Sequence, residues 1–519
     1  MVCGLLAAFV AVCIGYLVAG LVAPDADPVA AVGEASIGLS PAPVKNFAIS
    51  AFGSHDKVVL VCGILAVLAV FAAGVGLLAA RRLWLGLLGV AVFAVVGLAA
   101  ALTRPTASPG YALPTLAGTA AAAITLALLV RGSAGKAAVP VPSSEIAWPE
   151  PDAGHAGRAA GPEPTRRSFL ITGTAAAGTA AVAYGGGRLL TERTSVARAQ
   201  AGLRIPRPVH PAPALPAGSD LRIPGLSPFI SPNGSFYRVD TAIVLPEVPP
   251  GSWQLRLHGM VAREITITFD QLIRRPLTAD YLTLTCVSNP VGGPYVGNAL
   301  WLGASVASLL RQAGVRAGAD QLLCTSADGF TSGTPLQTVM DGRDAMLAVA
   351  MNGAALPVEH GFPVRMVVPG LYGYVSACKW ITDIEVTTYA ANVAYWAQRG
   401  WDARGPIKTE SRIDVPSGSA TLKPGHTPVA GVAWAQHKGI AAVEVQVDNG
   451  PWQQARLAAV PGIDCWRQWV WDWDATPGTH TIQARATDAT GYTQTPLQQP
   501  PEPNGASGYP SVSVSVSGA

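Results

Sequence analysis

Four long apolar runs in the first quarter of the chain constrain its fold more than any other feature. Each run has the length that a helix needs to cross a bilayer, about 20 residues. A buried core helix could explain one such run, but not four that lie close together and are nearly free of charge. The runs cover roughly residues 2–23, 58–80, 83–102 and 111–130. We therefore predict a membrane domain over residues 1–190.

A fifth, shorter run that is rich in Gly and Ala covers about residues 168–187. It follows the stretch Thr-Arg-Arg-Ser-Phe-Leu at 165–170, which resembles the twin-arginine export signal, here internal rather than N-terminal. The alternative is an ordinary basic pair at a membrane boundary. The Phe-Leu pair and the weak hydrophobicity of the following run favour the export signal. Because that route carries folded proteins, typically around a cofactor, the stretch hints at a cofactor in the exported domain.

The placement of Lys and Arg predicts how the helices are oriented. Arg81 and Arg82 separate the second and third runs, while the segment 24–57 carries four acidic residues against two lysines. Five basic residues lie between the fourth and fifth runs: Arg131, Lys136, Arg158, Arg166 and Arg167. Basic loops stay inside, so we expect a multi-pass protein of the cell membrane with a cytoplasmic N-terminus and five spans. Everything after about residue 190 then lies on the outer face, and the bundle serves as an anchor.

The rest of the chain has the composition of a soluble protein. Half of all residues are hydrophobic and 13% are charged, but the apolar excess lies before about residue 190. Residues 191–235 are Pro-rich and lack periodicity, which indicates a linker. Strand-like and helix-like runs mix over 236–405, an α+β pattern. Alternating strands without helices over 406–519 predict an immunoglobulin-like β-sandwich.

A single cysteine at the end of a strand is the most informative residue of this second half. Residues 281–286 alternate as a strand that ends at Cys286, and a Pro/Gly loop follows at 289–293. Such a thiol is a packed core residue, half of a disulfide, a nucleophile or a metal ligand, and the local pattern leaves all of these open. The seven cysteines form no Cys-x-x-Cys pair, which excludes a redox dithiol and an attached c-type haem.

Several short blocks occur in one order along the second half. They read SFYRVDT at 235–241, LTLTC at 282–286, ADGFTSGTPL at 327–336, MNGAALP at 351–357 and HGFPVR at 360–365, with further blocks at 368–373, 379–380, 431–434, 443–448 and 485–488. From about residue 230 onward these blocks resemble the sulfite oxidase superfamily. The resemblance implies a molybdopterin-binding α+β domain followed by a sandwich-type domain through which the chains form a homodimer.

In that family the strand-end cysteine binds molybdenum as a thiolate, beside the dithiolene of one molybdopterin. The resemblance therefore implies that Cys286 is a metal ligand and a catalytic residue, and that the cofactor is molybdenum-molybdopterin. High-valent molybdenum accepts soft sulfur donors, and the charge of a metal keeps a bound thiol deprotonated. The loop after Cys286 leaves space for oxo groups and substrate.

The resemblance also implies which residues hold the pterin and its phosphate. His360 and Arg365 match the family's His-Gly-x-Pro-x-Arg segment, in which a guanidinium fork suits a phosphate. Ser376 and Lys379 match a stretch that wraps the phosphate, here about one residue longer than in sulfite oxidases. The full set of implied cofactor contacts is Tyr237, Arg238, Thr325, His360, Arg365, Ser376 and Lys379. Candidates for the rim of the pocket are Asn289, Tyr295, Asn298, Asp328 and Tyr372.

Three departures from the family bear on the substrate. Sulfite oxidases carry arginine where this chain has Pro290 and Val291, arginine again at Val239, and tyrosine at Phe330. A doubly charged sulfite needs those cations, because burying an unpaired anion is costly. We expect a two-electron oxo transfer on an unknown small sulfur- or nitrogen-containing molecule. The alternatives are a sulfoxide reductase of the exported methionine sulfoxide repair type, and a cofactor-free membrane protein that binds or assembles partners.

The sequence also bears on electron transfer and partners. No His-Pro-Gly-Gly run occurs, and His55 is the only histidine before His155, so we predict no haem and expect electrons to pass to an external cytochrome or quinone. A disulfide between Cys324 and Cys378 is the alternative to two packed thiols. The net charge of +3, without a basic cluster, gives no indication of nucleic-acid binding.

Overall fold

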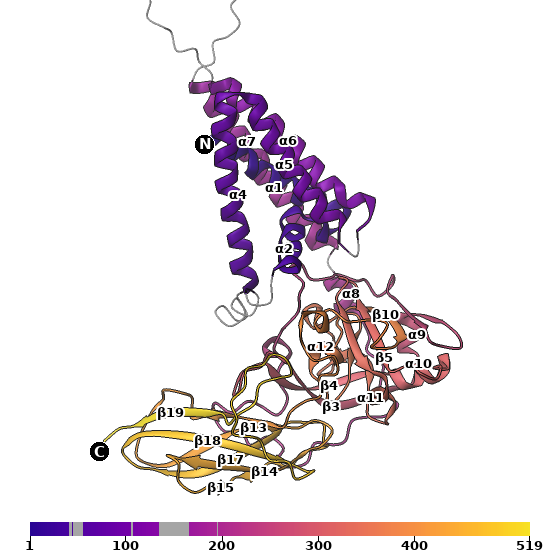
Figure 1. Ribbon diagram of the computed structural model, residues 1–519, viewed down its shortest axis with the longest axis vertical. Coiled ribbons are helices and arrows are strands. Elements are labelled where there is room, and N and C mark those ends of the chain that lie inside the picture. The colour runs from indigo at the N-terminus through magenta and orange to yellow at the C-terminus, as the bar shows by residue number, and fades with distance from the viewer. Residues whose placement is uncertain (41–43, 45–55, 105–106, 134–165, 195, 519) are drawn as a thin grey trace, which may run out of the picture. The chain divides into compact units, whose positions relative to one another are not determined.

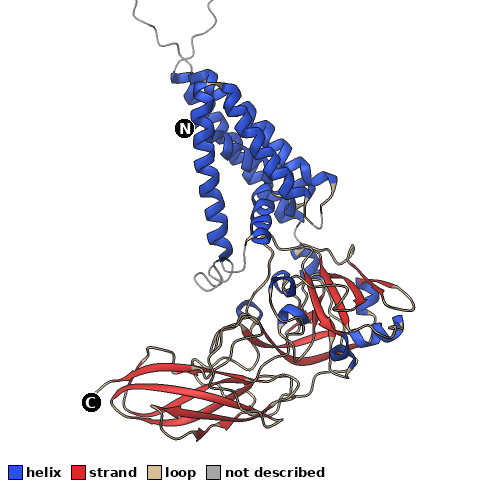
Figure 2. Cartoon of the chain, in the orientation of Figure 1, coloured by secondary structure: helices blue, strands red, loops and turns tan. Residues whose placement is uncertain are grey.

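The computed structural model describes residues 1–519 except 41–43, 45–55, 105–106, 134–165, 195 and 519. The chain divides into a helical unit, Met1–Ser195 with Ala242–Val244, and a β-rich unit, Val196–Thr241 with Leu245–Ala519. Figure 1 labels the elements of both units, and Figure 2 shows helices in the first and mostly strands in the second.

The helical unit contains every apolar run that the sequence indicates. Its helices are α1 (Val2–Val22), α2 (Pro28–Leu39), α4 (Asp56–Arg81), α5 (Leu83–Leu102), α6 (Ala112–Ser133) and α7 (Arg166–Thr194). Among the described residues, four segments are long and apolar enough to cross a membrane: Val2–Val22, Val58–Arg81, Leu83–Leu102 and Pro109–Gly132. The fifth predicted span falls on α7, which is not one of the four, and it stays a prediction. Thr165 of the export-like stretch lies outside the described residues.

Glycines allow the helices of this unit to approach closely. A Cβ on Gly118 of α6 would lie 2.6 Å from the carbonyl oxygen of Ala11 in α1, and one on Gly4 would collide with the carbonyl of Ala72 in α4. Helix α7 packs on α1 through the small side chains of Ala176, Ala180 and Ala183. Such contacts are typical of helices that associate in lipid.

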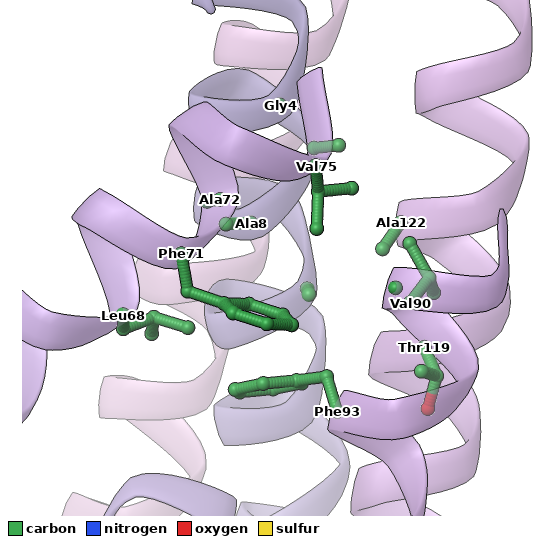
Figure 3. Close-up of a pocket in the computed structure, with 13 residues that line it drawn as sticks. Gly4, Ala8, Leu68, Phe71, Ala72, Val75, Val90, Phe93, Thr119 and Ala122 are labelled. Carbon is green, nitrogen blue, oxygen red and sulfur yellow. The ribbon is translucent and has the colours of Figure 1, made fainter. Parts of the chain in front are cut away.

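An apolar cavity lies between α1, α4, α5 and α6 (Figure 3). The rings of Phe71 and Phe93 point into it, and Thr119 supplies the one side-chain hydroxyl among its thirteen lining residues. That hydroxyl donates to the carbonyl of Thr115 within the same helix. The cavity therefore has an apolar lining and carries no group suited to acid–base or metal chemistry.

Two sheets form the first part of the β-rich unit. One has the order β2-β1-β10-β5-β6, and the other has the order β3-β4-β7-β8 with β9 paired to β7. The strands are β1 (Gln254–Gly259), β2 (Ile265–Thr268), β3 (Leu277–Thr285), β4 (Val296–Ser305), β5 (Gln321–Ser326), β6 (Thr331–Pro335), β7 (Met346–Met351), β8 (Ala354–Ala355), β9 (Arg365–Val367) and β10 (Ile381–Thr387). Only the pairing of β1 with β10 is parallel in these two sheets.

Short helices connect these strands. They are α8 (Ala197–Gly202), α9 (Phe269–Ile273), α10 (Val306–Ala313), α11 (Leu336–Met340) and α12 (Gly373–Ser376). One apolar core joins both sheets to α10, and it includes Leu257 of β1, Leu347 of β7 and Leu310 of α10. This is the α+β arrangement that the sequence predicts. Two of the predicted phosphate contacts lie in these elements, Arg365 at the start of β9 and Ser376 at the end of α12.

Strands alone form the C-terminal part, which we call the C-terminal sandwich. One sheet has the order β11-β13-β17-β16 and the other β12-β19-β18-β14-β15. The strands are β11 (Glu410–Val415), β12 (Thr421–Leu422), β13 (Gly425–Trp434), β14 (Ile440–Val447), β15 (Gln453–Gln454), β16 (Arg456–Leu457), β17 (Arg467–Ala475), β18 (Gly478–Asp488) and β19 (Ser511–Val516). Val443 and Ile482 of one sheet share a core with Val429 and Trp469 of the other. The immunoglobulin-type assignment stays a prediction.

Within this unit the C-terminal sandwich meets β3 along a polar seam. The Thr283 amide donates to the carbonyl of Asp464 at 2.9 Å, and the Gln436 side chain donates to the carbonyl of Thr283 at 2.9 Å. The indole nitrogen of Trp466 donates to the carbonyl of Phe229, in the Pro-rich segment, at 2.8 Å. The Pro-rich segment therefore packs against both parts. This seam supports the strand that leads to Cys286.

Candidate active site

Cys286 stands directly after β3, where the sheet holds it firmly. β3 pairs with β4 without interruption from Leu277 to Thr285, and the Cys286 amide continues the ladder by donating to the carbonyl of Tyr295 at 2.9 Å. The chain then turns, because the Asn289 amide donates to the carbonyl of Cys286 at 3.1 Å. The predicted strand end and loop are therefore confirmed. The side chain lies in a buried position at the base of the loop.

The surroundings of Cys286 favour a thiol unless a cation is bound. Burial raises the pKa of this thiol, while the amide and hydroxyl of Ser288 and the charge of Lys379 act in the opposite direction. A bound metal would reverse the balance, since it keeps a coordinated thiol deprotonated. Among the residues that the structure describes, no three His, Cys, Asp or Glu side chains gather around a metal position.

Three of the predicted cofactor residues come together, and we call His360, Arg365 and Lys379 the basic group. The Arg365 guanidinium donates to the carbonyl of His360 at 3.0 Å. The Lys379 ammonium donates to the carbonyl of Glu359 at 2.9 Å. Gly361 lies between them at φ 108°, and a Cβ there would lie 3.0 Å from Cβ of Arg365 and 3.2 Å from Cα of Lys379. Only glycine allows this close approach.

One carboxylate partly balances the basic group. Asp240 accepts from Lys379 at 3.0 Å and from Arg238 at 2.9 Å. Arg238, the most exposed of the predicted set, thus reaches the basic group through Asp240. The sequence analysis assigned no role to Asp240. Its position two residues after Arg238 could have indicated an ion pair between these two residues. The sequence analysis also missed Trp301, whose ring lies 5.0 Å beneath the guanidinium of Arg365.

Burial is the main influence on the pKa values of the basic group. Burial lowers the pKa of Arg365 to about 10 and that of Lys379 to about 8. It lowers the pKa of His360 to about 4, and the charges of Arg365 and Lys379 act in the same direction. Buried cations normally have a paired anion. The imbalance therefore indicates a site for an anionic ligand such as a phosphate.

Several buried polar atoms at the site lack a partner within the protein. They are Nε of Arg365, Nδ1 of His360 and Nδ2 of Asn289. Nε2 of His360 lies 3.1 Å from the carbonyl of Asn233, so Nε2 carries the proton and Nδ1 is an acceptor. Two free donors and one free acceptor suit a ligand with both phosphate and heterocyclic nitrogen groups. The residues present therefore fit a pterin phosphate.

The remaining predicted cofactor residues lie in different settings. Burial raises the pKa of Tyr237, and so does the charge of Cys286, whereas Arg365 lowers it, so this phenol is influenced by charges from both parts of the site. The Ser376 hydroxyl donates to the carbonyls of Leu371 and Tyr372, so it serves the chain itself. Thr325 belongs to β5 in the other sheet, where it pairs with Thr331 and Asp383.

Two of the rim candidates, Asn289 and Asn298, also lie in different settings. Asn289 lies in the loop after Cys286, and its Oδ1 accepts from the Tyr295 amide at 2.8 Å. Asn298 was wrongly placed at the rim: it is fully buried, and its side chain bonds Thr283 and the carbonyl of Phe229. Of the residues that depart from the family, Val239 is 44% exposed. Phe330 packs against Tyr395 with ring centroids 5.6 Å apart.

The other cysteines of this unit are structural. Cys324 and Cys378 are free and buried, and Sγ of Cys324 lies 3.9 Å from Sδ of Met366. Cys465 is also buried, and its thiol donates to the carbonyl of Tyr281 at 3.2 Å. The structure therefore contains two packed thiols in place of the alternative disulfide. Cys286 is the thiol that stands at the predicted strand end, whereas Cys378 is a buried thiol whose pKa the charge of Arg365 lowers.

Comparison with known proteins adds a family to this geometry. The family model for the oxidoreductase molybdopterin binding domain matches residues 242–396. Sulfite oxidase of Gallus gallus is 29% identical over 296 residues, which are 48% of this chain and 63% of that protein. Mitochondrial sulfite oxidase of Mus musculus is 28% identical over 47% of this chain and 52% of its own length. The chain thus spans between about half and two thirds of these relatives.

A smaller relative is covered more fully. The uncharacterized oxidoreductase YuiH of Bacillus subtilis is 30% identical over 153 residues, which are 30% of this chain and 74% of that protein. Among solved structures, the sulfane dehydrogenase SoxCD from Paracoccus pantotrophus aligns with 51% of this chain and 74% of its own chain, at 26% identity and a TM-score of 0.46. The region that matches the family model, residues 242–396, contains Cys286 and the basic group.

Proposed function

Because the chain belongs to the sulfite oxidase superfamily of molybdopterin-binding oxidoreductases, we propose that it is a membrane-anchored molybdenum enzyme. It would transfer oxygen to or from a small sulfur- or nitrogen-containing substrate. One observation carries the proposal: a strand-end cysteine, whose pKa the charge of Lys379 lowers, belongs to the same fold as a buried basic group that one carboxylate only partly balances. Each feature alone is compatible with a structural role. Together they suit a metal cofactor that has a phosphate tail.

Each residue has a definite role in this proposal. Cys286 supplies the metal thiolate, while Arg365 and Lys379 hold the phosphate. Nδ1 of His360 accepts from a pterin N–H group, because its other nitrogen donates to Asn233. Tyr237, Arg238, Ser376 and Thr325 complete the proposed contacts, Arg238 through Asp240 and Ser376 through its backbone. When bound, molybdenum-molybdopterin supplies the two-electron oxo transfer.

The chain itself contributes rigidity, charge and exclusion of water. The ladder from β3 into the Cys286 amide fixes the direction of the thiol. The buried position of Cys286 limits access of water to its sulfur. Asn289 presents a free Nδ2 donor in the loop after Cys286, which can orient an oxygen of the substrate. Such preorganised donors act most strongly where water is excluded.

The absence of the family's arginines at these positions supports a neutral substrate. Pro290, Val291 and Val239 occupy the positions at which sulfite oxidases carry cations. Arg365 and Lys379 are assigned to the cofactor phosphate, so they do not replace those cations. Sulfoxides and N-oxides carry no net charge and would enter at lower cost than sulfite. A sulfoxide reductase of the exported methionine sulfoxide repair type would be one enzyme with such a neutral substrate.

The proposal extends to location and partners. The four apolar helices support anchoring in a membrane. From the basic loops and the twin-arginine-like stretch, we propose five spans and an extracytoplasmic catalytic domain. The C-terminal sandwich would be the immunoglobulin-like dimerisation domain, and an external cytochrome or quinone would exchange electrons with the site.

Metal content tests the proposal most directly. The full chain, produced in a host that makes the cofactor, should contain molybdenum and yield the fluorescent oxidation product of molybdopterin. Cys286→Ser should fold, lose the metal and lose turnover in a screen of sulfoxides, N-oxides and sulfite. Cys465→Ser is the matched control, because a serine there keeps the bond to the Tyr281 carbonyl. Wild-type protein without metal would instead favour the cofactor-free binding protein.

A further inference from the structure

An arginine of the C-terminal sandwich reaches the loop that follows Cys286. Arg412 lies in β11, and its Nη1 donates at 3.2 Å to the carbonyl of Gly293, 119 residues earlier in the chain. The side chain of Arg412 is 11% exposed, and Gly293 is buried. A buried carbonyl needs a hydrogen-bond donor. Arg412 therefore satisfies a carbonyl of the loop that carries Asn289.

Fixed partners hold the guanidinium of Arg412 in one orientation. Its Nε donates to Oδ1 of Asp414 at 2.6 Å, and its Nη2 donates to the hydroxyl of Ser227 at 2.8 Å. The Ser227 amide donates to Oδ2 of Asp414 at 3.0 Å, which closes the network. A guanidinium fork held in this way loses little further freedom when it binds another acceptor, so Nη1 is a preorganised donor to Gly293. Asp414 also balances the charge of Arg412, which is compatible with a neutral substrate.

Gly293 packs directly against the side chain of Asn289. A Cβ on Gly293 would lie 2.6 Å from Oδ1 of Asn289. The same Oδ1 accepts from the Tyr295 amide at 2.8 Å, and the Gly293 amide donates to the carbonyl of Pro290 at 2.8 Å. Nδ2 of Asn289 is buried and has no partner among the residues that the structure describes. A displacement of Gly293 would therefore move the amide group that carries this free donor.

A second contact with the C-terminal sandwich lies one residue earlier in the loop. Gly292 has φ 71°, and a Cβ on it would lie 3.4 Å from Cβ of Pro510, the residue before β19. The residues between β3 and β4, all of them described, form no helix or strand. Contacts from elsewhere in the chain therefore decide the shape of this loop. The C-terminal sandwich supplies two of them on successive residues.

We propose that Arg412 is a positioning residue of the active site. Through Gly293 it holds the amide group of Asn289 in the orientation in which Nδ2 donates to an oxygen of the substrate. Arg412 acts through Asn289 and exchanges no proton or electron. This role rests on the proposed function, in which Asn289 orients the substrate. It makes the C-terminal sandwich a part of the active site in addition to its proposed part in dimerisation.

Alkylation of the cofactor-free full chain in detergent tests the positioning without any turnover. Arg412→Met removes the donor to the loop, so the loop should open more often and Cys286 at its base should react with iodoacetamide roughly tenfold faster. Peptide mass spectrometry measures the rate at each cysteine, and the rate at the buried Cys324 should stay unchanged. Arg467→Met is the matched control, because Arg467 donates to two backbone carbonyls of the sandwich and to none of the loop.

Two outcomes of the alkylation would overturn the positioning role. One is an unchanged rate at Cys286 in Arg412→Met, and the other is an equal increase in Arg467→Met. If Arg412→Met also exposes Cys324, the milder variant Arg412→Lys decides, because an ammonium lacks the planar fork but keeps the charge. Cys286 should then react several-fold faster than in the wild type while Cys324 stays protected, and a wild-type rate at Cys286 would overturn the role.

Turnover of molybdenum-loaded protein tests whether Arg412 acts through Asn289. For the sulfoxide or N-oxide on which the wild type turns over, Arg412→Met and Asn289→Ala should each lower kcat/KM roughly tenfold or more at unchanged molybdenum content. Because both changes remove the same interaction, the double variant should be no slower than Asn289→Ala alone. A double variant in which the two losses multiply would overturn the role. Wild-type protein without molybdenum would refute the proposed function, and the alkylation rates would still decide whether Arg412 holds the loop.

Discussion

Lys379 provides the sharpest test of whether the basic group is built for an anion. Burial lowers its pKa from the ordinary 10.5 to about 8, with Arg365 and Arg238 acting in the same direction and Asp240 opposing them. Between these two pH values the unfolded chain binds more protons than the folded chain. The stability of the cofactor-free protein should therefore rise with pH through this window. The substitution Lys379→Met should remove this contribution.

The size of the effect follows from the two pKa values. One pKa unit corresponds to about 1.4 kcal/mol, so charged Lys379 costs the cofactor-free protein about 3 kcal/mol at pH 7. The free energy of unfolding of the wild type, relative to Lys379→Met, should thus increase by about 3 kcal/mol between pH 8 and 10.5. A bound anion favours the charged ammonium, so pyrophosphate should abolish the rise below pH 10.

Urea unfolding of the full chain, followed by tryptophan fluorescence, measures this difference. Trp253, Trp301 and Trp380 are buried in the α+β part and report its unfolding. Tyrosines and thiols titrate in the same window. Those that Lys379 does not influence cancel in the difference, and comparing the two proteins in a Cys286→Ser background removes the one thiol whose pKa depends on the charge of Lys379. A difference that is flat from pH 8 to 10.5, or that falls, would refute the reasoning. A rise that persists in pyrophosphate would show that the anion binds elsewhere.

Two further predictions concern His360 of the basic group and the buried Asn298 of β4. Because the folded pKa of His360 is about 4 and its ordinary value is 6.5, the cofactor-free protein should lose up to about 3 kcal/mol of stability as the pH falls through this interval. The same unfolding assay should show a smaller loss for His360→Gln, and an equal loss would contradict the assignment. Asn298→Leu should lower the free energy of unfolding by about 2–4 kcal/mol, because the Thr283 hydroxyl and the Phe229 carbonyl lose a buried partner; a change within error would be the contrary result.

Local patterns were enough to predict much of the fold. Hydropathy identified α1, α4, α5 and α6, because a helix that crosses a membrane must be apolar over its whole length. Alternation and turn residues located β3 and the loop after Cys286, because strand period and chain reversal are local properties. The fifth run is different. It forms the helix α7, but its weak hydropathy does not decide whether this helix crosses the membrane.

Which residues make up the site depends on long-range contacts, and no local sequence pattern contains these. His360, Arg365 and Lys379 were identified through resemblance to family blocks, and the fold then brought them together from separate segments. Asp240 and Trp301 were missed because their roles appear only when Lys379 and Arg365 reach them. Asn298 was misplaced for the same reason, since its partners come from distant parts of the chain. Long-range burial decides the function of each of these residues.

The polar seam along β3 has a consequence for biogenesis. β3 is an edge strand of its sheet, and an open edge can pair with another chain and start aggregation. Here the first half of the edge is bridged by His210, and the second half is covered by Asp464 and Gln436. The strand that carries the site thus becomes protected only after the C-terminal sandwich has been synthesised and has docked. During synthesis, the edge of β3 therefore stays open to pairing with another chain until nearly the whole chain has been made.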